Sequence, residues 1–169
     1  VFDTSFHQSL PERSYLYAIP RSFHKKHGVR RYGFHGSSHS YVAQTAASQL
    51  GFPLENSRIL SAHLGTGCSA TAILNGQSVD TTMGMTPLEG LVMGTRSGDI
   101  DPGVILFLSK ELNMPTQEIS NLLNQQSGLL GLSGISNDMR ELREQAAEGS
   151  DEAAIAIEIF CYRAAKSLA

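Results

Sequence analysis

The sequence predicts a mixed α/β fold, and two observations support this prediction. Residues 58–82 contain three short apolar segments separated by glycine-containing turns, a pattern typical of neighbouring β-strands. Segments on both sides of this cluster repeat apolar residues every three or four positions, which is typical of amphipathic helices. Strands followed by several helices indicate an α/β domain, and 169 residues are enough for one domain with its own core.

The strand cluster is expected to form a small meander. Residues 58–64 form an apolar run that fits a buried strand. Gly65-Thr66-Gly67 then predicts a tight turn, and residues 68–74 alternate small and apolar side chains. Asn75-Gly76 is a strong hairpin signal because a type I′ turn needs positive φ at both positions, so residues 77–82 are expected to return as the third strand.

The segments before the strands give weaker patterns. Residues 1–27 are expected to be irregular, because prolines interrupt their apolar pieces. Residues 30–34 predict a short strand, and residues 37–50 predict a helix capped by Ser37 or Ser38. The expected apolar face of this helix consists of Val42, Ala46, Ala47 and Leu50.

The C-terminal half is expected to alternate loops and helices. Glycine-rich residues 83–99 and Gly/Ser-rich residues 127–137 predict loops. Asp101 and Pro102 predict the cap and first turn of a helix that ends near Leu112. Further helices are expected at 116–125, from Asp138 onward and at 150–169. The last helix has an apolar series at Ala154, Ile157, Cys161, Ala164 and Leu168.

Composition narrows the classes of function. The net charge is −3, with no basic excess that would indicate a nucleic-acid partner. No apolar stretch reaches the roughly 20 residues needed to span a membrane, and no signal peptide is visible. Cys68 and Cys161 form no CxxC pattern, so free thiols and a cytoplasmic location are expected.

Two further observations lead us to expect a piece of a longer protein. The chain begins with Val, and its last predicted helix has no Gly, Asn or Pro to end it. Charged residues make up 17% of the chain, below the roughly 25% usual in soluble domains. We therefore expect that another domain or subunit covers part of the surface.

The turn at residues 65–70 matches the loose dinucleotide pattern G-x-G-x-x-A. That pattern requires a helix after the glycines, and here a strand follows, so a Rossmann site is excluded. No G-x-x-x-x-G-K-[ST] is present either. A glycine turn between strands can still direct backbone N–H groups at a phosphate. An ordinary hairpin is the alternative, although His63 and Ser69 on either side favour a site.

Two more segments carry candidate chemistry. Arg96, flanked by glycines and small residues and followed by Asp99 and Asp101, fits a bidentate phosphate clamp or an Arg–Asp ion pair equally well. His35, between Phe34 and Gly36, can donate to an oxyanion or hold a structural turn. His35 is expected to precede the helix that contains His39, so a two-histidine zinc face is not expected.

Together these segments resemble the acetokinase family over essentially the whole chain. The matching stretches are FDTSFHQSLP, YGFHGSSH, SAHLGTG, NGQSVDTTMGMTPLEGLVMGTRSGDIDPG, SGLLGLSG and NDMRELR. The resemblance implies two ribonuclease-H-like domains, as in the actin, sugar-kinase and heat-shock-chaperone superfamily. Residues 1–169 would be a single partial domain, the first part of the second, nucleotide-binding domain, with residues 1–5 near the interdomain hinge.

The resemblance also implies a reaction and its residues. Family members move the γ-phosphate of ATP to acetate, so ATP/ADP, Mg²⁺ and a homodimer are implied. Asp3 matches the catalytic aspartate, and His35 and Arg96 match residues that stabilise the transition state. The nucleotide-contacting residues are matched by His63, Leu64, Gly65, Thr66, Gly67, Asp138, Met139 and Arg140. No residue here matches the magnesium ligand, which the family supplies from later in its second domain.

Several points stay open at this stage. Thr66 and Cys68 depart from the family's usual Asn and small residue in the phosphate turn, although Thr66 can still donate one hydrogen bond. Phe34 weakly favours acetate over propionate. A non-catalytic nucleotide-binding module and a hydrolase using Ser37 or Ser38 are the other candidates, and the missing G-x-S-x-G counts against the hydrolase. Because the family's other active-site segments have no match, the chain alone is expected to be inactive.

Overall fold

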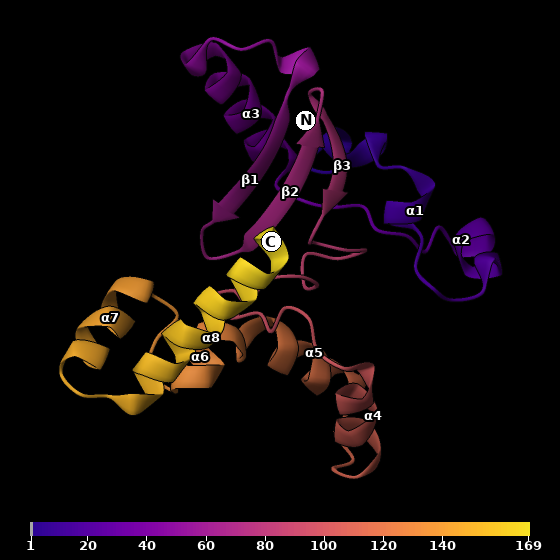
Figure 1. Cartoon of the computed structure of the whole chain (residues 1–169). Helices are drawn as coiled ribbons and strands as arrows, with labels where there is room; N and C mark the ends of the chain where they lie inside the picture. Colours follow the sequence, from indigo (N-terminus) through magenta and orange to yellow (C-terminus); the bar gives the residue numbers. More distant parts are fainter. Residues whose placement is uncertain (1) are drawn as a thin grey trace. The chain divides into compact units, whose positions relative to one another are not determined.

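The computed structural model describes residues 2–169, which form two compact units. The first unit comprises the chain up to Leu64 together with Ser69–Glu89, and the second comprises Gly65–Cys68 and Gly90–Ala169. The elements in Figure 1 are α/β overall, as the sequence predicts. Across residues 2–169, no helix combines the length and the apolar character needed to cross a membrane.

The first unit is built on a three-stranded sheet in the order β1-β2-β3 (Figure 1). The strands are β1 (Arg58–Leu64), β2 (Cys68–Leu74) and β3 (Gln77–Thr81), so the predicted meander is confirmed. β2 and β3 pair antiparallel, with a bulge at Ala72/Ile73. Asn75 and Gly76 have φ of 53° and 79°, as a type I′ turn requires.

The prediction that β1 is a buried strand is wrong. Among its residues only Ser61 is buried, while Leu60 and Leu64 are 63% and 58% exposed. The apolar run does form a strand, but within the described residues β1 is an edge strand with only one neighbouring strand.

Helix α3 (Gly36–Leu50) packs against β1 and confirms the helix predicted at 37–50. Its buried residues are Gly36, His39, Ala43 and Ala47, so the predicted face was wrong except for Ala47. Val42 and Leu50 are exposed because the sheet-facing stripe carries small residues and a histidine instead of the largest apolar ones. Neither Ser37 nor Ser38 caps the helix: the N-cap is His35, at φ 56°.

The N-terminal region is more ordered than the sequence predicts. Its short helices are η1 (Ser5–Ser9), α1 (Glu12–Tyr15) and α2 (Arg21–His27), and η2 (Leu54–Asn56) follows α3. Pro11 and Pro20 do not prevent these helices because each proline is an N-cap rather than an interior residue.

Residues 30–34 form no strand, which corrects another prediction. The backbone N–H groups of Tyr32 and Gly33 both donate to the carbonyl of Gly84, at 3.0 and 3.2 Å, instead of forming a ladder. The Arg31 guanidinium donates to three successive carbonyls, those of Thr81, Thr82 and Met83. Arg31 also pairs with Glu89 at 2.6 Å. The Arg31 side chain thus binds the carbonyls at the end of β3 and directly after it.

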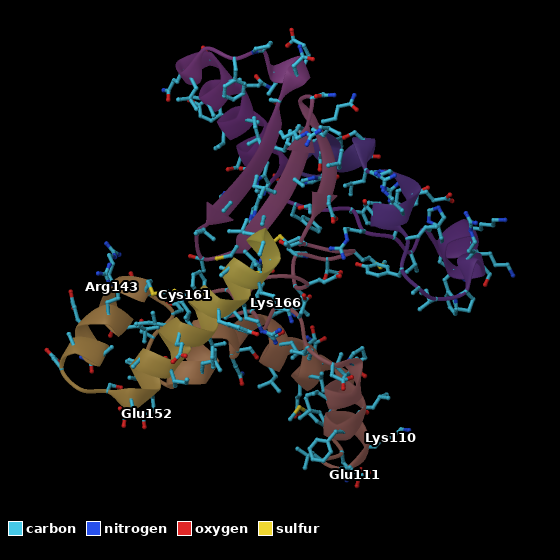
Figure 2. The ribbon with its side chains drawn as sticks, viewed as in Figure 1. Lys110, Glu111, Arg143, Glu152, Cys161 and Lys166 are labelled. Atoms are coloured by element: carbon cyan, nitrogen blue, oxygen red, sulfur yellow. The ribbon has the colours of Figure 1, made fainter. Side chains whose placement is uncertain are left out.

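The second unit is helical. It contains α4 (Pro102–Lys110), α5 (Thr116–Gln125), α6 (Gly128–Ser133), α7 (Met139–Ala147) and α8 (Asp151–Leu168). Figure 2 shows charged side chains such as Lys110 and Glu152 pointing away from these helices. The predicted cap Asp101 and the predicted helix start at Asp138 are confirmed, since each aspartate accepts a hydrogen bond from the backbone two residues later.

Two predictions for this unit were wrong. The segment 127–137 contains α6, which its Gly/Ser content conceals. In α8 the buried residues are Ala153 and Ala156, with Ile157 and Phe160 packed against the core, whereas Ala154 and Cys161 are exposed. The stripe is shifted because the core partners Leu129 and Leu142 meet small side chains on α8.

Candidate functional site

Asp3 and His35 lie in contact in the first unit. The backbone N–H of His35 donates to Asp3 Oδ2 at 2.7 Å, and the N–H of Gly36 donates to the Asp3 carbonyl at 2.9 Å. His35 has no capping bond from its own side chain. The Asp3 carboxylate therefore serves as an external cap for α3, in place of the serine cap expected from the sequence.

The His35 imidazole contacts His63 and Ser69. It stacks on His63, with ring centroids 3.9 Å apart and an interplanar angle of 23°. Its Nδ1 lies 2.9 Å from the hydroxyl of Ser69, which is fully buried on β2. His63 is held by Ser38 of α3, whose hydroxyl is 3.0 Å from His63 Nδ1. The predicted residues Asp3, His35 and His63 are therefore brought together.

A second pair of histidines lies beneath these residues, fully buried. His39 bonds to Ser61 through Nδ1 at 3.0 Å and to Ser69 through Nε2 at 2.8 Å. His7 bonds to the Ser78 hydroxyl and to the Phe34 carbonyl, each at 2.9 Å. Burial lowers the pKa of His39 to about 4, and burial also lowers the pKa of His7. Both imidazoles are therefore neutral at physiological pH.

The Gly65–Gly67 turn belongs to the second unit and is held by hydrogen bonds within residues 65–68. The Gly65 N–H donates to the Gly67 carbonyl at 3.2 Å, and the Cys68 thiol donates to the Gly65 carbonyl at 3.2 Å. Burial raises the pKa of the Cys68 thiol to about 11, so it stays a thiol that can donate. The turn itself is open to solvent at Gly65 and Thr66.

Gly94 brings three of the predicted segments together within the second unit. Its N–H donates to the Thr66 carbonyl at 2.9 Å. A Cβ at Gly94 would lie 3.3 Å from Thr66 and 3.4 Å from the Asn137 side chain, which precedes Asp138. The glycine turn, the Arg96 loop and the Asp138 segment therefore meet at a residue where even a Cβ would be tightly packed.

The Arg96 loop is fixed by backbone hydrogen bonds from its own unit. Met93 N–H donates to the Arg96 carbonyl at 3.2 Å, and Ser127 N–H donates to the Thr95 carbonyl at 2.9 Å. The first turn of α6 donates to the same loop, from Leu129 to Met93 and from Leu130 to Gly94. The position of Arg96 thus depends on α6, the helix that the sequence did not predict.

Asp138 and Arg140 lie at the start of α7. The Asp138 carboxylate accepts from the backbone and the guanidinium of Arg140, at 2.8 and 2.7 Å. These bonds hold the pKa of Asp138 down to about 2. The Arg140 side chain is 88% exposed, whereas Met139 packs against the helical core. Of this segment, Asp138 and Arg140 are thus open to a ligand, and Met139 is structural.

The predicted residues therefore fall into two groups. Asp3, His35 and His63 form one group in the first unit. Thr66, the Arg96 loop and the Asp138 segment form the other in the second unit. Leu64, at the end of β1, is exposed and contributes no polar group.

Sequence reasoning missed His7, His39 and Ser61, and it noted Ser69 only as a neighbour of the glycine turn. The position of His39 four residues after His35 was a usable signal, since residues four apart share a helix face. No equivalent signal marked Ser61, and nothing in the sequence linked Ser69 to a histidine. The hydroxyls of both serines matter because the fold places histidines from other elements against them.

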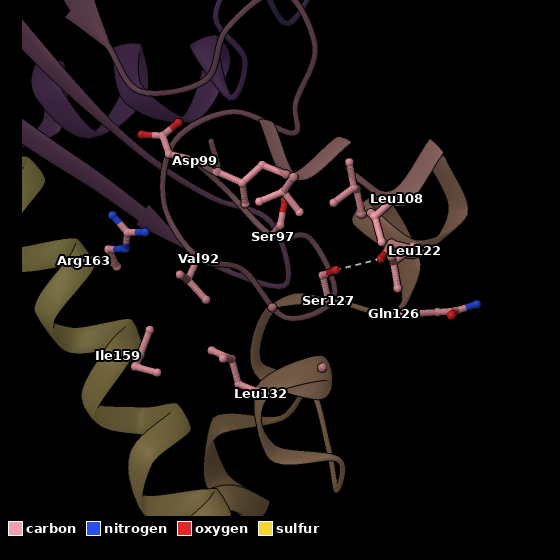
Figure 3. Close-up of a pocket in the computed structure, with 15 residues that line it drawn as sticks. Val92, Ser97, Asp99, Leu108, Leu122, Gln126, Ser127, Leu132, Ile159 and Arg163 are labelled. Atoms are coloured by element: carbon pink, nitrogen blue, oxygen red, sulfur yellow. Dashed lines mark hydrogen bonds between the residues drawn. The ribbon is translucent and has the colours of Figure 1, made fainter. Parts of the chain in front are cut away.

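A cavity of about 480 Å³ lies within the second unit and is separate from these groups (Figure 3). Its walls are mostly apolar, from residues such as Val92, Leu108 and Leu132, with Asp99 and Arg163 as the charged lining. None of the predicted site residues lines it. Nor do residues 2–169 contain a cluster of three or more His, Cys, Asp or Glu side chains able to hold a metal ion.

Comparison with known proteins identifies the family. The Acetokinase family profile matches residues 1–169. An acetate kinase of Stutzerimonas stutzeri (strain A1501) is 60% identical over the whole chain, which corresponds to 43% of that protein. The crystal structure of Porphyromonas gingivalis acetate kinase matches 96% of the chain and 41% of its own, at 50% identity and a TM-score of 0.94.

A propionate kinase structure from Francisella tularensis subsp. tularensis SCHU S4 is equally similar, at 53% identity and a TM-score of 0.94 over 98% of this chain and 42% of its own. The chain thus spans about 43% of the length of the curated relatives that it matches. The match of the family profile to every residue shows that the chain belongs to the acetokinase family.

Proposed function

We propose that this chain is part of an acetate kinase, which transfers the γ-phosphate of ATP to acetate to give acetyl phosphate and ADP, reversibly. The observation that carries the proposal is the meeting of the glycine turn, the Arg96 loop and the Asp138 segment around Gly94. Exposed glycine turns and a guanidinium are suited to a polyphosphate, and ATP fits the open turn at Gly65 and Thr66.

In this proposal the chain is the first part of the second, ribonuclease-H-like domain of the enzyme, with residues 1–5 near the interdomain hinge. The antiparallel sheet of the first unit, followed by helices, supports this assignment. A homodimer is proposed from the family, and light scattering of the full-length protein tests it.

Each site residue has a defined part in the proposed reaction. In-line transfer spreads charge over three equatorial oxygens of the phosphoryl group, so positioning and electrostatics provide the catalysis. Arg96 supplies positive charge there, and His35 supplies a hydrogen-bond donor. His63 to Gly67 and Asp138 to Arg140 contact the nucleotide. Mg²⁺, which would enter with the nucleotide, neutralises phosphate charge when bound.

Asp3 has a positioning role in this scheme. Acetate is already ionised at neutral pH and needs no general base. One oxygen of Asp3 accepts the N–H of His35, the residue that donates to the phosphoryl group. Asp3 therefore orients His35 and, with its other oxygen, the substrate or a magnesium-bound water.

Hydroxamate trapping of acetyl phosphate tests the proposal. Full-length protein that contains this sequence is expected to form acetyl phosphate from ATP, Mg²⁺ and acetate. The Arg96→Ala variant is expected to lose on the order of 10²–10³ in rate, as for the loss of one transition-state donor. Arg21→Ala, which removes an exposed arginine paired with Glu12, is the matched control. Absence of product from the wild-type enzyme contradicts the proposal.

The 169-residue chain alone is expected to give no turnover, because residues that the family places elsewhere in the enzyme complete the site. The same trapping assay, run on purified chain, checks this. A yield well above the background without protein would show that residues 1–169 are sufficient.

Propionate is the second candidate substrate, and the Francisella tularensis propionate kinase structure favours it. The two acids differ by one methylene, worth only about 1–3 kcal/mol in a pocket. The ratio of kcat/KM for acetate and propionate decides between them.

A further inference from the structure

We propose that Ser69 is a positioning residue that fixes the proton of His35 on Nε2, through a hydrogen-bond chain that begins at Ser61. This inference rests on the proposed function for its catalytic consequence, but the proton position is a separate structural claim. The chain runs from Ser61 to His39, Ser69 and His35, with successive distances of 3.0, 2.8 and 2.9 Å.

Stacking alone does not orient the His35 ring. The His63 ring lies 3.9 Å away and nearly parallel, which fixes the plane of the His35 imidazole. A half-turn about the bond that carries the ring keeps that plane but exchanges Nδ1 with a carbon atom. The Ser69 hydroxyl at 2.9 Å removes this ambiguity, because only Nδ1 can bond to it.

The direction of the chain follows from its buried end. Within residues 2–169 the Ser61 hydroxyl has one hydrogen-bond partner, His39 Nδ1, and Ser61 is 4% exposed. If His39 carried its proton on Nδ1, the buried hydroxyl proton of Ser61 would have no acceptor, which costs about 1–3 kcal/mol. Ser61 therefore donates, and neutral His39 accepts through Nδ1.

The remaining protons are then determined. His39 carries its single proton on Nε2 and donates it to Ser69 Oγ. The Ser69 hydroxyl, having accepted there, donates its own proton to His35 Nδ1. Neutral His35 must accordingly be protonated on Nε2. Within this hydrogen-bond chain, His39 and Ser69 each donate one hydrogen bond and accept one.

This arrangement gives a reason for the buried polar side chains between α3 and the sheet. The His39 imidazole bonds to Ser61 and Ser69 and reaches the His35 imidazole through Ser69, and Ser61 is two hydrogen bonds further from the His35 imidazole than Ser69. Their joint effect is to present His35 as a neutral donor through Nε2. A preorganised donor stabilises developing phosphoryl charge without a reorientation step.

The test uses ¹⁵N-histidine NMR of the full-length protein at pH 8, with the His35 signals identified by their loss in His35→Gln. Wild type is expected to show His35 as a single tautomer protonated on Nε2. Ser69→Ala removes the hydroxyl that selects it, and a mixture of tautomers is expected. Thr71→Val is the matched control, since Thr71 is a buried residue two positions along β2 whose hydroxyl bonds to that of Thr81 and not to a histidine in the described residues.

Ser61→Ala gives the sharper result, because Ser61 does not touch His35. Without the Ser61 hydroxyl, His39 Nδ1 has no partner whichever way the hydrogen bonds run. Neither direction of the hydrogen-bond chain is then preferred, so a mixture of tautomers is again expected at His35. The Ser61→Ala variant also provides the test if Ser69→Ala does not fold. Wild-type His35 protonated on Nδ1, or Ser61→Ala indistinguishable from wild type, overturns the proposal.

Kinetics separate this proposal from the proposed function. In acetyl phosphate formation, Ser69→Ala is expected to lower kcat by at least about tenfold with KM for acetate changed less than about threefold, since an unoriented donor weakens the transition state. An unchanged kcat with mixed tautomers overturns the catalytic consequence. Wild-type protein without kinase activity refutes the proposed function, while the NMR result still decides the proton position.

Discussion

Asp3 joins the start of the chain to the start of α3 through two hydrogen bonds. Its carboxylate and its carbonyl accept the N–H groups of His35 and Gly36, at 2.7 and 2.9 Å. A Cβ at Gly36 would lie 2.4 Å from that carbonyl, so the close approach requires glycine. A carboxylate at this end of a helix also interacts favourably with the helix dipole. Asp3 therefore has a structural role beside its proposed catalytic one.

Two substitutions at Asp3 separate these roles. Asp3→Asn keeps an oxygen acceptor for the His35 N–H, so the free energy of unfolding is expected to stay within about 0.5 kcal/mol of wild type. Asp3→Ala removes the cap and is expected to lower it by about 1 kcal/mol. Both are expected to reduce kinase turnover of the full-length protein by on the order of 10², because both alter the group that orients the substrate.

Urea unfolding and acetyl phosphate trapping give the two readouts. Equal stability losses in the two variants would show that the charge, and not the hydrogen bond, supports α3. Wild-type turnover in Asp3→Asn would remove the carboxylate from the mechanism.

At the residue scale the sequence motifs named candidate site residues but could not predict their contacts. His35 and His63 were singled out by local pattern and Asp3 by the family resemblance, yet the three are far apart along the chain and meet only through tertiary packing. His39 was missed, and Ser69 was not linked to a histidine, for the same reason. A histidine inside a helix and a serine inside a strand give no sign of their contact until the fold places the two elements together.

At the element scale, strong local signals gave correct results. The signals for the hairpin at Asn75-Gly76, the cap at Asp101 and the helix start at Asp138 depend on backbone chemistry within a few residues. These predictions and the helix at 116–125 are confirmed. Faces were harder, because α3 and α8 bury small residues that periodicity ranks low. Helix α6 was missed because its glycines suggested a loop.

The two glycines that bound α6 give a matched pair of variants. Gly128 and Gly134 have almost the same φ, 62° and 66°. A Cβ at Gly128 would lie 2.2 Å from the Met93 carbonyl oxygen and 2.7 Å from that of Arg96, whereas nothing lies within 4 Å at Gly134. Gly134→Ala is expected to cost about 1 kcal/mol of stability, from the left-handed backbone alone. Gly128→Ala is expected to cost about 3 kcal/mol or more.

Denaturant unfolding of both variants measures the difference. Kinase assays should show a further loss only for Gly128→Ala, because that Cβ displaces the loop that carries Arg96. Equal costs at the two positions would mean that this loop yields easily and does not hold Arg96 in place.

At the scale of the whole molecule, the first unit is unusual for its buried polar side chains. His7, His39, Ser69, Thr71 and Ser78 are all essentially inaccessible to solvent. Hydrogen bonds such as those of His7 to Ser78, His39 to Ser69 and Thr71 to Thr81 compensate for the loss of water, but only while the imidazoles are neutral. Composition alone could not reveal this, because serine and histidine normally count as surface residues.

This interior makes stability depend on pH. Burial lowers the pKa of His39 from 6.5 to about 4, with His7, His35 and His63 lowering it further and Asp3 opposing them. Between these values the unfolded chain binds the proton that the folded chain excludes, so the free energy of unfolding falls as pH decreases. His39 alone is expected to account for a loss on the order of 3 kcal/mol between pH 7 and pH 4, and His7 shifts in the same direction.

Urea unfolding at a series of pH values measures the slope. His39→Gln, which cannot titrate, is expected to flatten the curve between pH 6.5 and pH 4. A variant that keeps the wild-type slope would place the titrating group elsewhere.

The exposed strand β1 has a consequence for how the sheet can grow. At the opposite edge of the sheet, β3 packs against η1. Within the described residues β1 has a neighbour on one side only, so its outward amide and carbonyl groups form a ready template, flanked by the uncovered side chains of Leu60 and Leu64. An added extended segment would continue the sheet past β1 and shield both leucines. Purified chain without such a segment is expected to self-associate through the β1 edge as its concentration rises.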